Sequence, residues 1–329
     1  MLKRANELAC LGLGLTGSNP IVGAVVVSAA GKIIGEGFHK SGPHAEVVAL
    51  EQAANLAIGS TLYATLEPCN HHGKTGPCTE AIIKAGISKV VYAVSDPNAL
   101  ASGGALALSA AGIEVVLNSE VPEVAYSNRA WLHKIRTGRP YFIWKIATTL
   151  DGKTAAIDGS SKWITGPESR AEVSKIRSES NAILIGTGTA LTDNPNLIPR
   201  EVIEQKRANP IRIVMGLRDV PATFNLHNGE AETVFVHSQD FADLLKFCQE
   251  REFNQVLVES GSELGTALLK AGLIDEIVIF QAPSLLGSGQ SFIGDLGIKS
   301  IEEKLNLVIR DVAQFGNDLK ITLTKEMGN

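Results

Sequence analysis

One histidine and two cysteines, His44, Cys69 and Cys78, are of the residue types that bind zinc. Imidazole and thiolate are borderline and soft ligands, and zinc accepts both in a tetrahedral arrangement. Three protein ligands leave the fourth tetrahedral position to water, which is typical of catalytic rather than structural zinc. Glu46 follows His44 by two residues, where it could take a proton from that water and deliver it to a leaving group. We therefore predict a catalytic zinc site.

Two further histidines, His71 and His72, leave an alternative open because they lie between the two cysteines. A structural zinc site that includes one of them would need no catalytic carboxylate. The order H-x-E followed by P-C…C is typical of zinc nucleobase deaminases, whose cysteines usually follow a C-x-x-C pattern. The wider spacing between Cys69 and Cys78 departs from that pattern.

Alternating strands and helices predict a layered α/β domain that positions these residues. His44 begins a predicted helix over 44–56, Cys69 follows a predicted strand over 61–66, and Cys78 precedes a helix over 79–85. The other expected elements are helices over 1–10 and 105–111 and strands over 21–27, 32–37, 89–94 and 113–117. Residues 120–140 are expected to form a helical bridge, so we place the domains at 1–138 and 139–329.

A second α/β series follows Arg139-Pro140. We expect strands over 141–147, 182–186, 211–215, 233–237, 255–259 and 276–281, and helices over 168–178, 240–250 and 264–271. The last two strands, 306–311 and 319–324, are joined by Gly316-Asn317, which predicts an antiparallel edge on the sheet.

Glycine-rich loops indicate where the second domain could bind phosphate. Residues 186–189 end a predicted strand, and residues 259–265 end another and open a helix, which is the order that anion binding at a helix N-terminus requires. Each loop alone is also consistent with a tight turn. A third pattern, 12–17, matches G-x-G-x-x-G but follows a helix and precedes a strand. This order is the reverse of a dinucleotide site, so we interpret 12–17 as a connecting loop.

Composition excludes several classes of function. The chain has 329 residues and a net charge of −5, and aromatic residues make up 5%. A general nucleic-acid binder needs a basic surface and aromatic side chains for stacking. Residues 8–31 carry no charge but are interrupted by glycines and Pro20, so they are too short to span a membrane. We expect a cytoplasmic enzyme with reduced thiols, no membrane contact and no nucleic-acid partner.

With these motifs in place, the chain resembles the bifunctional deaminase-reductase family of riboflavin biosynthesis. The matching motifs of the first domain are His44-Ala45-Glu46, residues 66–78, Asn19-Pro20-Ile21-Val22-Gly23 and Asp96-Pro97-Asn98. Those of the second are residues 150–153, 161–165, 188–190 and 193–195. In that family the eight-residue insert between the cysteines is the norm, which accounts for the unusual spacing.

The resemblance implies an enzyme with two consecutive reactions. A cytidine-deaminase-like three-layer α/β/α domain would use Zn²⁺ to deaminate 2,5-diamino-6-(5-phosphoribosylamino)pyrimidin-4-one, releasing ammonia. A dihydrofolate-reductase-like α/β domain would then use NADPH to reduce the ribosyl unit to a ribityl chain. It also implies a homo-oligomer, a dimer or tetramer, that acts on a small phosphorylated pyrimidine. A nucleic-acid editing zinc deaminase with an appended binding domain is the main alternative, and a structural-zinc scaffold is another.

The resemblance also assigns residues to roles. In the first domain, Glu46 is catalytic, His44, Cys69 and Cys78 bind the metal, and the substrate residues are Asn19, His39, His71, Lys74 and Asp96. In the second, the cofactor residues are Ala147, Trp163, Thr189, Asp193, Gly261, Ser262, Glu263, Leu264, Gly265, Thr266 and Ala267. The substrate residues there are Lys145, Asp151, Ser161, Arg177, Leu197, Arg200 and Glu259. The arginines suit phosphate because their guanidinium groups offer paired donors. The sequence assigns no residue to selecting the 2′-phosphate of NADPH.

Overall fold

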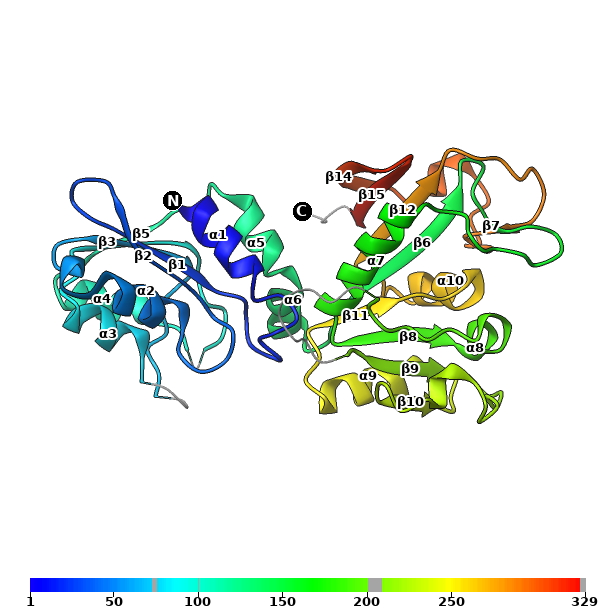
Figure 1. Ribbon diagram of the computed structural model, residues 1–329, viewed down its shortest axis with the longest axis horizontal. Helices are drawn as coiled ribbons and strands as arrows, with labels where there is room; N and C mark the ends of the chain where they lie inside the picture. The colour runs from blue at the N-terminus through cyan, green and yellow to red at the C-terminus, as the bar shows by residue number, and fades with distance from the viewer. Residues whose placement is uncertain (73–75, 100, 201–208, 326–329) are drawn as a thin grey trace. The chain divides into compact units, whose positions relative to one another are not determined.

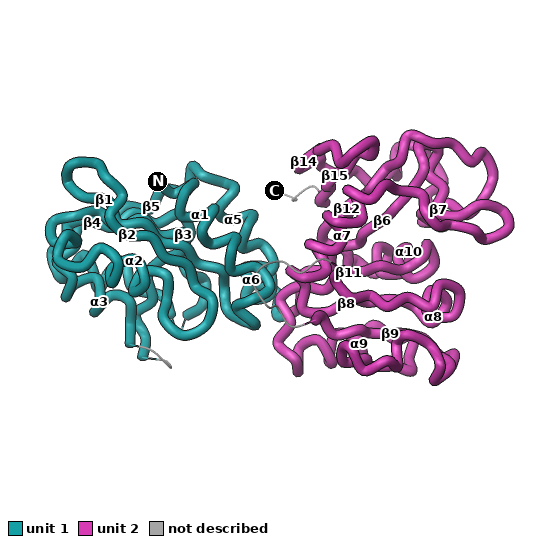
Figure 2. Tube along the Cα trace, viewed as in Figure 1, with its two compact units in different colours: residues 1–138 teal, residues 139–329 magenta. Residues whose placement is uncertain are grey.

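The computed structural model describes residues 1–329 except 73–75, 100, 201–208 and 326–329 (Figure 1). The chain divides into two compact units, Met1–Gly138 and Arg139–Asn329, which Figure 2 colours separately. Each unit has its own sheet and its own hydrophobic core. Both units alternate strands and helices, as the hydrophobic pattern predicts.

The first unit is built on a five-stranded sheet in the order β2-β1-β3-β4-β5. Strand β1 pairs antiparallel with β2 and β3, whereas β3, β4 and β5 run parallel. The bounds are β1 Gly23–Val27, β2 Ile33–Phe38, β3 Thr61–Leu66, β4 Lys89–Val94 and β5 Glu114–Leu117. The β1–β2 hairpin and the parallel strands match the predicted elements within a few residues.

Helices cover both faces of this sheet, because successive strand side chains point to opposite faces. Val25 and Val27 pack with Leu8 of α1, while Ala24 and Val26 join the core on the other face. That second core includes side chains of α2, α3 and α4. The bounds are α1 Leu2–Cys10, α2 Ala45–Ala53, η1 Ala54–Ala57, α3 Cys78–Lys84, α4 Gly104–Ala110, α5 Pro122–Ser127 and α6 Arg129–Thr137. The unit is therefore a three-layer α/β/α fold.

The second unit is built on an eight-stranded sheet in the order β10-β9-β8-β11-β6-β12-β15-β14. The strands from β10 to β12 run parallel, and β15 and β14 add an antiparallel edge, as predicted. The bounds are β6 Tyr141–Thr149, β8 Ala182–Gly186, β9 Ile211–Met215, β10 Thr233–Val236, β11 Gln255–Val258, β12 Glu276–Ala282, β14 Leu307–Phe315 and β15 Asp318–Lys325. A separate pair joins β7 Lys153–Ala155 to β13 Gln290–Ser291.

Helices of the second unit pack closely on its sheet (Figure 1). A Cβ on Gly265 would lie 2.1 Å from the Trp144 ring, so α10 rests directly on β6 at that point. The bounds are α7 Pro167–Glu179, α8 Thr187–Asp193, η2 Asn225–His227, α9 Phe241–Glu250, α10 Ser262–Lys270 and η3 Ile301–Glu303. Helix α8 and the β7–β13 pair are absent from the sequence-based expectation. Within the described residues, no helix combines the length and apolar character needed to cross a lipid bilayer.

Candidate functional site

Three neighbouring elements of the first unit bring the predicted zinc ligands together. His44 is the N-cap of α2, Cys69 follows β3, and Cys78 is the first residue of α3. Their ligand atoms all lie within 4.8 Å of one another. His44 Nδ1 is 3.2 Å from Cys78 Sγ and 3.4 Å from Cys69 Sγ. Ordinary zinc–nitrogen and zinc–sulfur bonds at a tetrahedral angle place such atoms about 3.5 Å apart, so the three residues fit zinc.

Interactions among the three ligands favour ionised sulfur at one cysteine. The Cys78 thiol donates to Cys69 and, together with His44, lowers the pKa of Cys69 to about 4. The same pairing raises the pKa of Cys78, because one proton is shared between two buried sulfurs. Metal binding requires both thiolates and therefore releases that proton. His72 is exposed and pairs with Glu80 at 3.4 Å, so it lies outside the ligand cluster.

Glu46 lies in the first turn of α2, two residues after His44, and is 3% exposed. Its Oε2 has no hydrogen-bond partner within the described part of the chain. Burial raises the pKa of Glu46, and the nearby Cys69 charge raises it further. A buried carboxyl group beside a metal cluster, with one oxygen unsatisfied, is suited to exchanging a proton with a ligand in the site.

Three of the predicted substrate residues, His39, His71 and Asp96, lie around the cluster. The His39 ring is 5.4 Å from the His44 ring, centroid to centroid. Asp96 is buried, which raises its pKa, and it interacts electrostatically with Cys69 and His71. Asn19 lies in the exposed loop before β1, where its carbonyl accepts a hydrogen bond from Thr16. Lys74 lies outside the described residues.

Glu67 holds the Asp96 loop in place. It directly precedes the Pro68-Cys69 turn, and its carboxylate accepts the backbone N–H groups of Asp96 at 3.3 Å and Ala105 at 3.0 Å. A Cβ on Gly104 would lie 1.7 Å from the Pro68 carbonyl oxygen, so α4 packs against this turn without a side chain. These contacts fix the position of Cys69 relative to Asp96.

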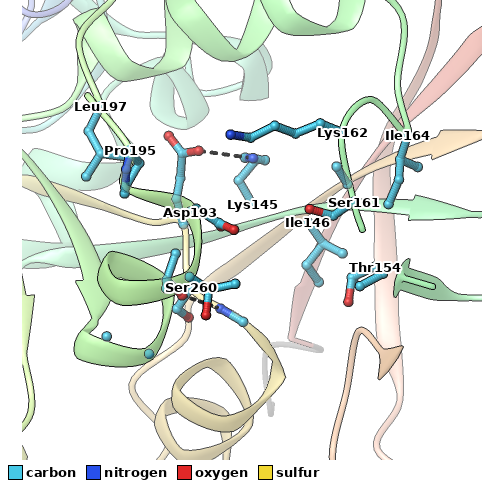
Figure 3. A pocket seen from close by; sticks show the side chains of 18 of the residues that line it. Lys145, Ile146, Thr154, Ser161, Lys162, Ile164, Asp193, Pro195, Leu197 and Ser260 are labelled. Atoms are coloured by element: carbon cyan, nitrogen blue, oxygen red, sulfur yellow. Dashed lines mark hydrogen bonds and ion pairs between the residues drawn. The ribbon is translucent and has the colours of Figure 1, made fainter. Parts of the chain in front are cut away.

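The second unit has a cavity of about 790 Å³ at the carboxyl ends of its parallel strands. Six cationic and three acidic side chains occur among the described lining residues, so the lining favours anionic ligands. Two glycine-containing segments meet there, because the Gly261 N–H donates to Thr189 Oγ1 at 3.3 Å. Residues 186–189 run from the end of β8 into α8, and residues 259–265 run from β11 into α10; both keep the name glycine loops below. These loops offer backbone N–H groups close to the sheet. Figure 3 shows Lys145, Ser161, Lys162 and Asp193 around the same space.

An ion cluster lies at the inner wall of this cavity. Glu259 accepts from Arg177 Nε at 2.5 Å and Arg177 Nη2 at 2.9 Å, and Lys145 Nζ is 3.0 Å from its Oε2. Burial raises the pKa of Glu259, but Arg177 and Lys145 outweigh burial and lower it to about 2. The carboxylate therefore stays ionised and keeps both cations in place.

Most of the predicted reductase residues line the cavity. The lining includes Lys145, Ala147, Ser161, Trp163, Arg177, Thr189, Asp193, Leu197, Arg200, Glu259, Gly261, Ser262, Glu263 and Leu264. Gly265, Thr266 and Ala267 lie outside it: Gly265 contacts Trp144, and Thr266 accepts the Gly294 N–H. Asp151 also lies outside it and accepts the N–H groups of Leu286 and Gly287.

Three lining cations, Lys162, Arg170 and Arg218, were not singled out from the sequence. For Arg218 a signal exists, because it follows the predicted strand 211–215 at its carboxyl end, where α/β sheets bind ligands. Residues 12–17 connect α1 to β1. Glu36, which stands about 20 residues further on, where a dinucleotide site has its acidic residue, pairs instead with Arg4 at 2.7 Å. The third glycine pattern is thus a connecting loop, as predicted.

Comparison with known proteins relates each unit to a family. The model for the cytidine and deoxycytidylate deaminase zinc-binding region matches residues 1–94. The model for the RibD C-terminal domain matches residues 140–321.

Other relatives match the chain over both of its units. The riboflavin biosynthesis protein RibD of Mycobacterium tuberculosis (strain ATCC 25618 / H37Rv) is 42% identical over 94% of this chain and 92% of its own length. RibD of Aquifex aeolicus (strain VF5) is 43% identical over 97% and 96%. Among solved structures, Acinetobacter baumannii RibD (form 1) has a TM-score of 0.90 at 36% identity, covering 99% of this chain and 98% of that one. The Thermotoga maritima diaminohydroxyphosphoribosylaminopyrimidine deaminase/5-amino-6-(5-phosphoribosylamino)uracil reductase has a TM-score of 0.88 at 34% identity, covering 98% and 97%.

The folds, the ligand cluster and these matches define an enzyme with two activities, a zinc-dependent deaminase and an NADPH-dependent reductase. The chain belongs to the RibD family of bifunctional riboflavin biosynthesis proteins. The predicted family, fold class and pair of cofactors are confirmed.

Proposed function

We propose that the two activities are divided between the two units. Residues 1–138 deaminate 2,5-diamino-6-(5-phosphoribosylamino)pyrimidin-4-one, and residues 139–329 reduce 5-amino-6-(5-phosphoribosylamino)uracil. One observation carries the first half: three zinc-type ligands lie within 4.8 Å of one another, with the buried Glu46 on the same helix as His44. The surplus of cations around the cavity of the second unit supports the reductase half, because both NADPH and the substrate carry phosphate.

Bound zinc supplies an acidified water, and bound NADPH supplies a hydride. In the first unit, Glu46 accepts a proton from the attacking water and delivers it to the departing amino group. The ring carbon loses its amino group as ammonia and gains a carbonyl oxygen. The raised pKa of Glu46 suits this role, because one carboxyl group must both accept and donate the proton near neutral pH.

We assign the first unit's substrate contacts to Asn19, His39, His71, Asp96 and Lys74. The His39 ring beside His44, and Asp96 beside Cys69 and His71, provide polar groups at the metal cluster for a pyrimidine edge. Lys74, in the insert between the two cysteines, suits the substrate phosphate.

In the second unit, the open-chain form of the ribosylamine accepts a hydride at its C1′ carbon and a proton at the attached nitrogen, so it becomes a ribitylamine. The protein positions the two reactants and binds their phosphates. We assign the substrate to Lys145, Ser161, Arg177, Arg200 and Glu259, because three of them form the ion cluster and the other two line the same cavity. The glycine loops at Thr189 and Gly261 are assigned to the cofactor.

The test uses the full chain with Glu46→Gln, which removes the proton-accepting carboxylate but keeps the volume. We expect the variant to bind about one zinc per chain, as the wild type does, and to lose ammonia release by 10²-fold or more. It should still oxidise NADPH with the deaminated intermediate at the wild-type rate. Normal ammonia release would remove Glu46 from the mechanism, and loss of zinc would make it a structural residue.

A second measurement tests the order of the two reactions. Wild-type protein should oxidise NADPH with 5-amino-6-(5-phosphoribosylamino)uracil but not with the compound that still carries the second amino group. The nucleic-acid editing alternative is not favoured, since the net charge is −5 and the full-length relatives are riboflavin biosynthesis proteins.

The family resemblance also supports a homo-oligomer, a dimer or tetramer, in the cytoplasm. Strand β14 is an edge strand of the larger sheet and exposes Ile309 and Val312, which would suit pairing with another copy. Light scattering coupled to size exclusion measures the oligomeric state, and a monomer at micromolar concentration would contradict it.

A further inference from the structure

Arg218 and Lys162 differ from the other four cations of the reductase cavity, because no ion pair, side-chain hydrogen bond or ring contact among the described residues holds either of them. Of these two, Arg218 is the one that lies beside Gly188. Lys145 and Arg177 are held by Glu259. Arg170 and Arg200 lie over the Trp163 ring, at 4.7 Å and 5.5 Å from its centroid. Arg218 is exposed and makes no ion pair or hydrogen bond with a side chain in the described part of the chain. Its paired donors are therefore available to a ligand.

Contacts place Arg218 next to one of the two glycine loops. A Cβ on Gly188 would lie 3.0 Å from Arg218 Nη2, so the guanidinium group lies over the Gly188 backbone. Gly188 is in turn two residues after the end of β8, and Thr189 accepts from Gly261 of the other loop. The guanidinium group thus borders the glycine loops, which we assigned to the cofactor, without being part of them.

The strand order sets the order in which the proposed cofactor residues lie along the cavity. Ala147 lies on β6, Gly261 follows β11, Gly188 follows β8, and Arg218 follows β9. These four strands are adjacent in the sheet, in that order. Neighbouring strands are separated by 4.7–4.9 Å, so β6 and β9 are about 14 Å apart. A dinucleotide with its nicotinamide at Ala147 and its pyrophosphate at the two glycine loops would therefore bring its adenosine end to Arg218.

We propose that Arg218 binds the 2′-phosphate of the cofactor and is the residue by which this enzyme selects NADPH over NADH. The inference rests on the proposed function, because it needs the cofactor in this cavity. A guanidinium group is chemically suited to the role, since it forms two parallel hydrogen bonds to a phosphate and stays charged at every working pH. Of the three acidic lining residues, Glu259 is already neutralised by two cations. Only Asp193 and Glu263 among the described lining residues therefore remain to repel a phosphate.

The substrate phosphate is the other phosphate that could reach Arg218, and the strand order argues against it. The proposed substrate residues Lys145 and Glu259 lie on β6 and directly after β11, which are three strands and two strands away from β9. An effect of Arg218 on the substrate alone would therefore contradict the proposal.

Equilibrium binding to the full chain tests the inference without catalysis. Isothermal titration calorimetry compares 2′,5′-ADP, which carries the 2′-phosphate, with 5′-AMP, which lacks it. We expect Arg218→Ala to weaken 2′,5′-ADP binding roughly tenfold to hundredfold, the usual range for one charge-assisted contact, and to leave 5′-AMP unchanged. Arg218→Lys should keep part of the affinity, because charge remains but the paired donors are lost. Equal effects on both probes, or no effect on either, would overturn the proposal.

Steady-state kinetics gives a second readout on the same variants. With Arg218→Ala, the KM for NADPH should rise by the same factor, while kcat and the KM for the deaminated substrate stay constant. The kcat/KM for NADH should not fall. Lys246→Ala is the matched control, because Lys246 is an exposed cation on α9 outside the cavity lining, and its loss should change neither probe.

The two binding probes distinguish a failure of the reductase function from a failure of the Arg218 assignment. If wild-type protein neither prefers 2′,5′-ADP to 5′-AMP nor oxidises NADPH, the proposed reductase function is wrong. If the wild type prefers 2′,5′-ADP and Arg218→Ala keeps that preference, only the assignment of Arg218 is wrong. A rise in the substrate KM without a change in 2′,5′-ADP binding would likewise reject it and assign Arg218 to the substrate.

Discussion

Replacing Glu259 by glutamine tests how strongly the ion cluster stabilises the reductase unit. The carboxylate side chain is 6% exposed, and its two partners, Lys145 and Arg177, are each 16% exposed. Glutamine keeps the shape but removes the charge, so two largely buried cations lose their common counter-ion. We expect a clear loss of stability, because unpaired buried charge is costly.

The magnitude follows from the pKa of Glu259, which the two cations lower from 4.5 to about 2. At 1.36 kcal/mol per pKa unit, the ionised cluster contributes about 3 kcal/mol to the free energy of unfolding. Because the folded-state pKa lies below the unfolded value, this contribution is complete above about pH 4.5 and is lost as the pH falls toward 2. For a unit of this size, 3 kcal/mol corresponds to about 6–12 °C in Tm.

Differential scanning calorimetry of the full chain at pH 7 measures the effect, and the reductase transition is the one that NADP⁺ shifts upward. Phosphate and sulfate are left out of the buffer, since either anion could replace the lost carboxylate. Glu232→Gln is the control, because Glu232 pairs with Arg251 in a similar geometry but the side chains are 46% and 44% exposed. It should cost less than about 1 kcal/mol. If both variants lose the same stability, burial does not strengthen the Glu259 cluster and the reasoning is wrong.

Two other positions allow direct checks. Gly104→Ala places a Cβ 1.7 Å from the Pro68 carbonyl oxygen, so the turn that carries Cys69 must shift. The zinc content of this variant, measured by mass spectrometry, should therefore fall. Gly76→Ala is the control, because a Cβ there meets open space, and this variant should keep the metal. Equal zinc in both variants would contradict the packing argument. Burial raises the pKa of the Cys248 thiol to about 12, so iodoacetamide at pH 8 should leave it unmodified in the folded chain and alkylate it in urea. Modification before unfolding, located by peptide mapping, would show that Cys248 is accessible.

The sequence predicted the regular elements well where hydrophobic periodicity is strong. The strands Thr61–Leu66, Lys89–Val94 and Ala182–Gly186 were placed at the observed bounds. Helix α8 was not predicted, because glycine and threonine have low helix propensity and residues 186–189 were interpreted as a loop. The β7–β13 pair was also missed, since it joins short segments far apart in the sequence and neither carries an alternating pattern of its own.

By itself the sequence predicted the zinc ligand set, Glu46 and the division into two α/β series, because residue type, spacing and hydrophobic period are local properties of the chain. Only the tertiary structure decided which of the assigned residues share a site. It gathers Lys145, Arg177 and Glu259 from three separate segments and brings Arg218 to Gly188, whereas it packs Gly265 against Trp144. Such proximities depend on the order of strands in the sheet, and that order is set by burial of the whole core rather than by any one segment.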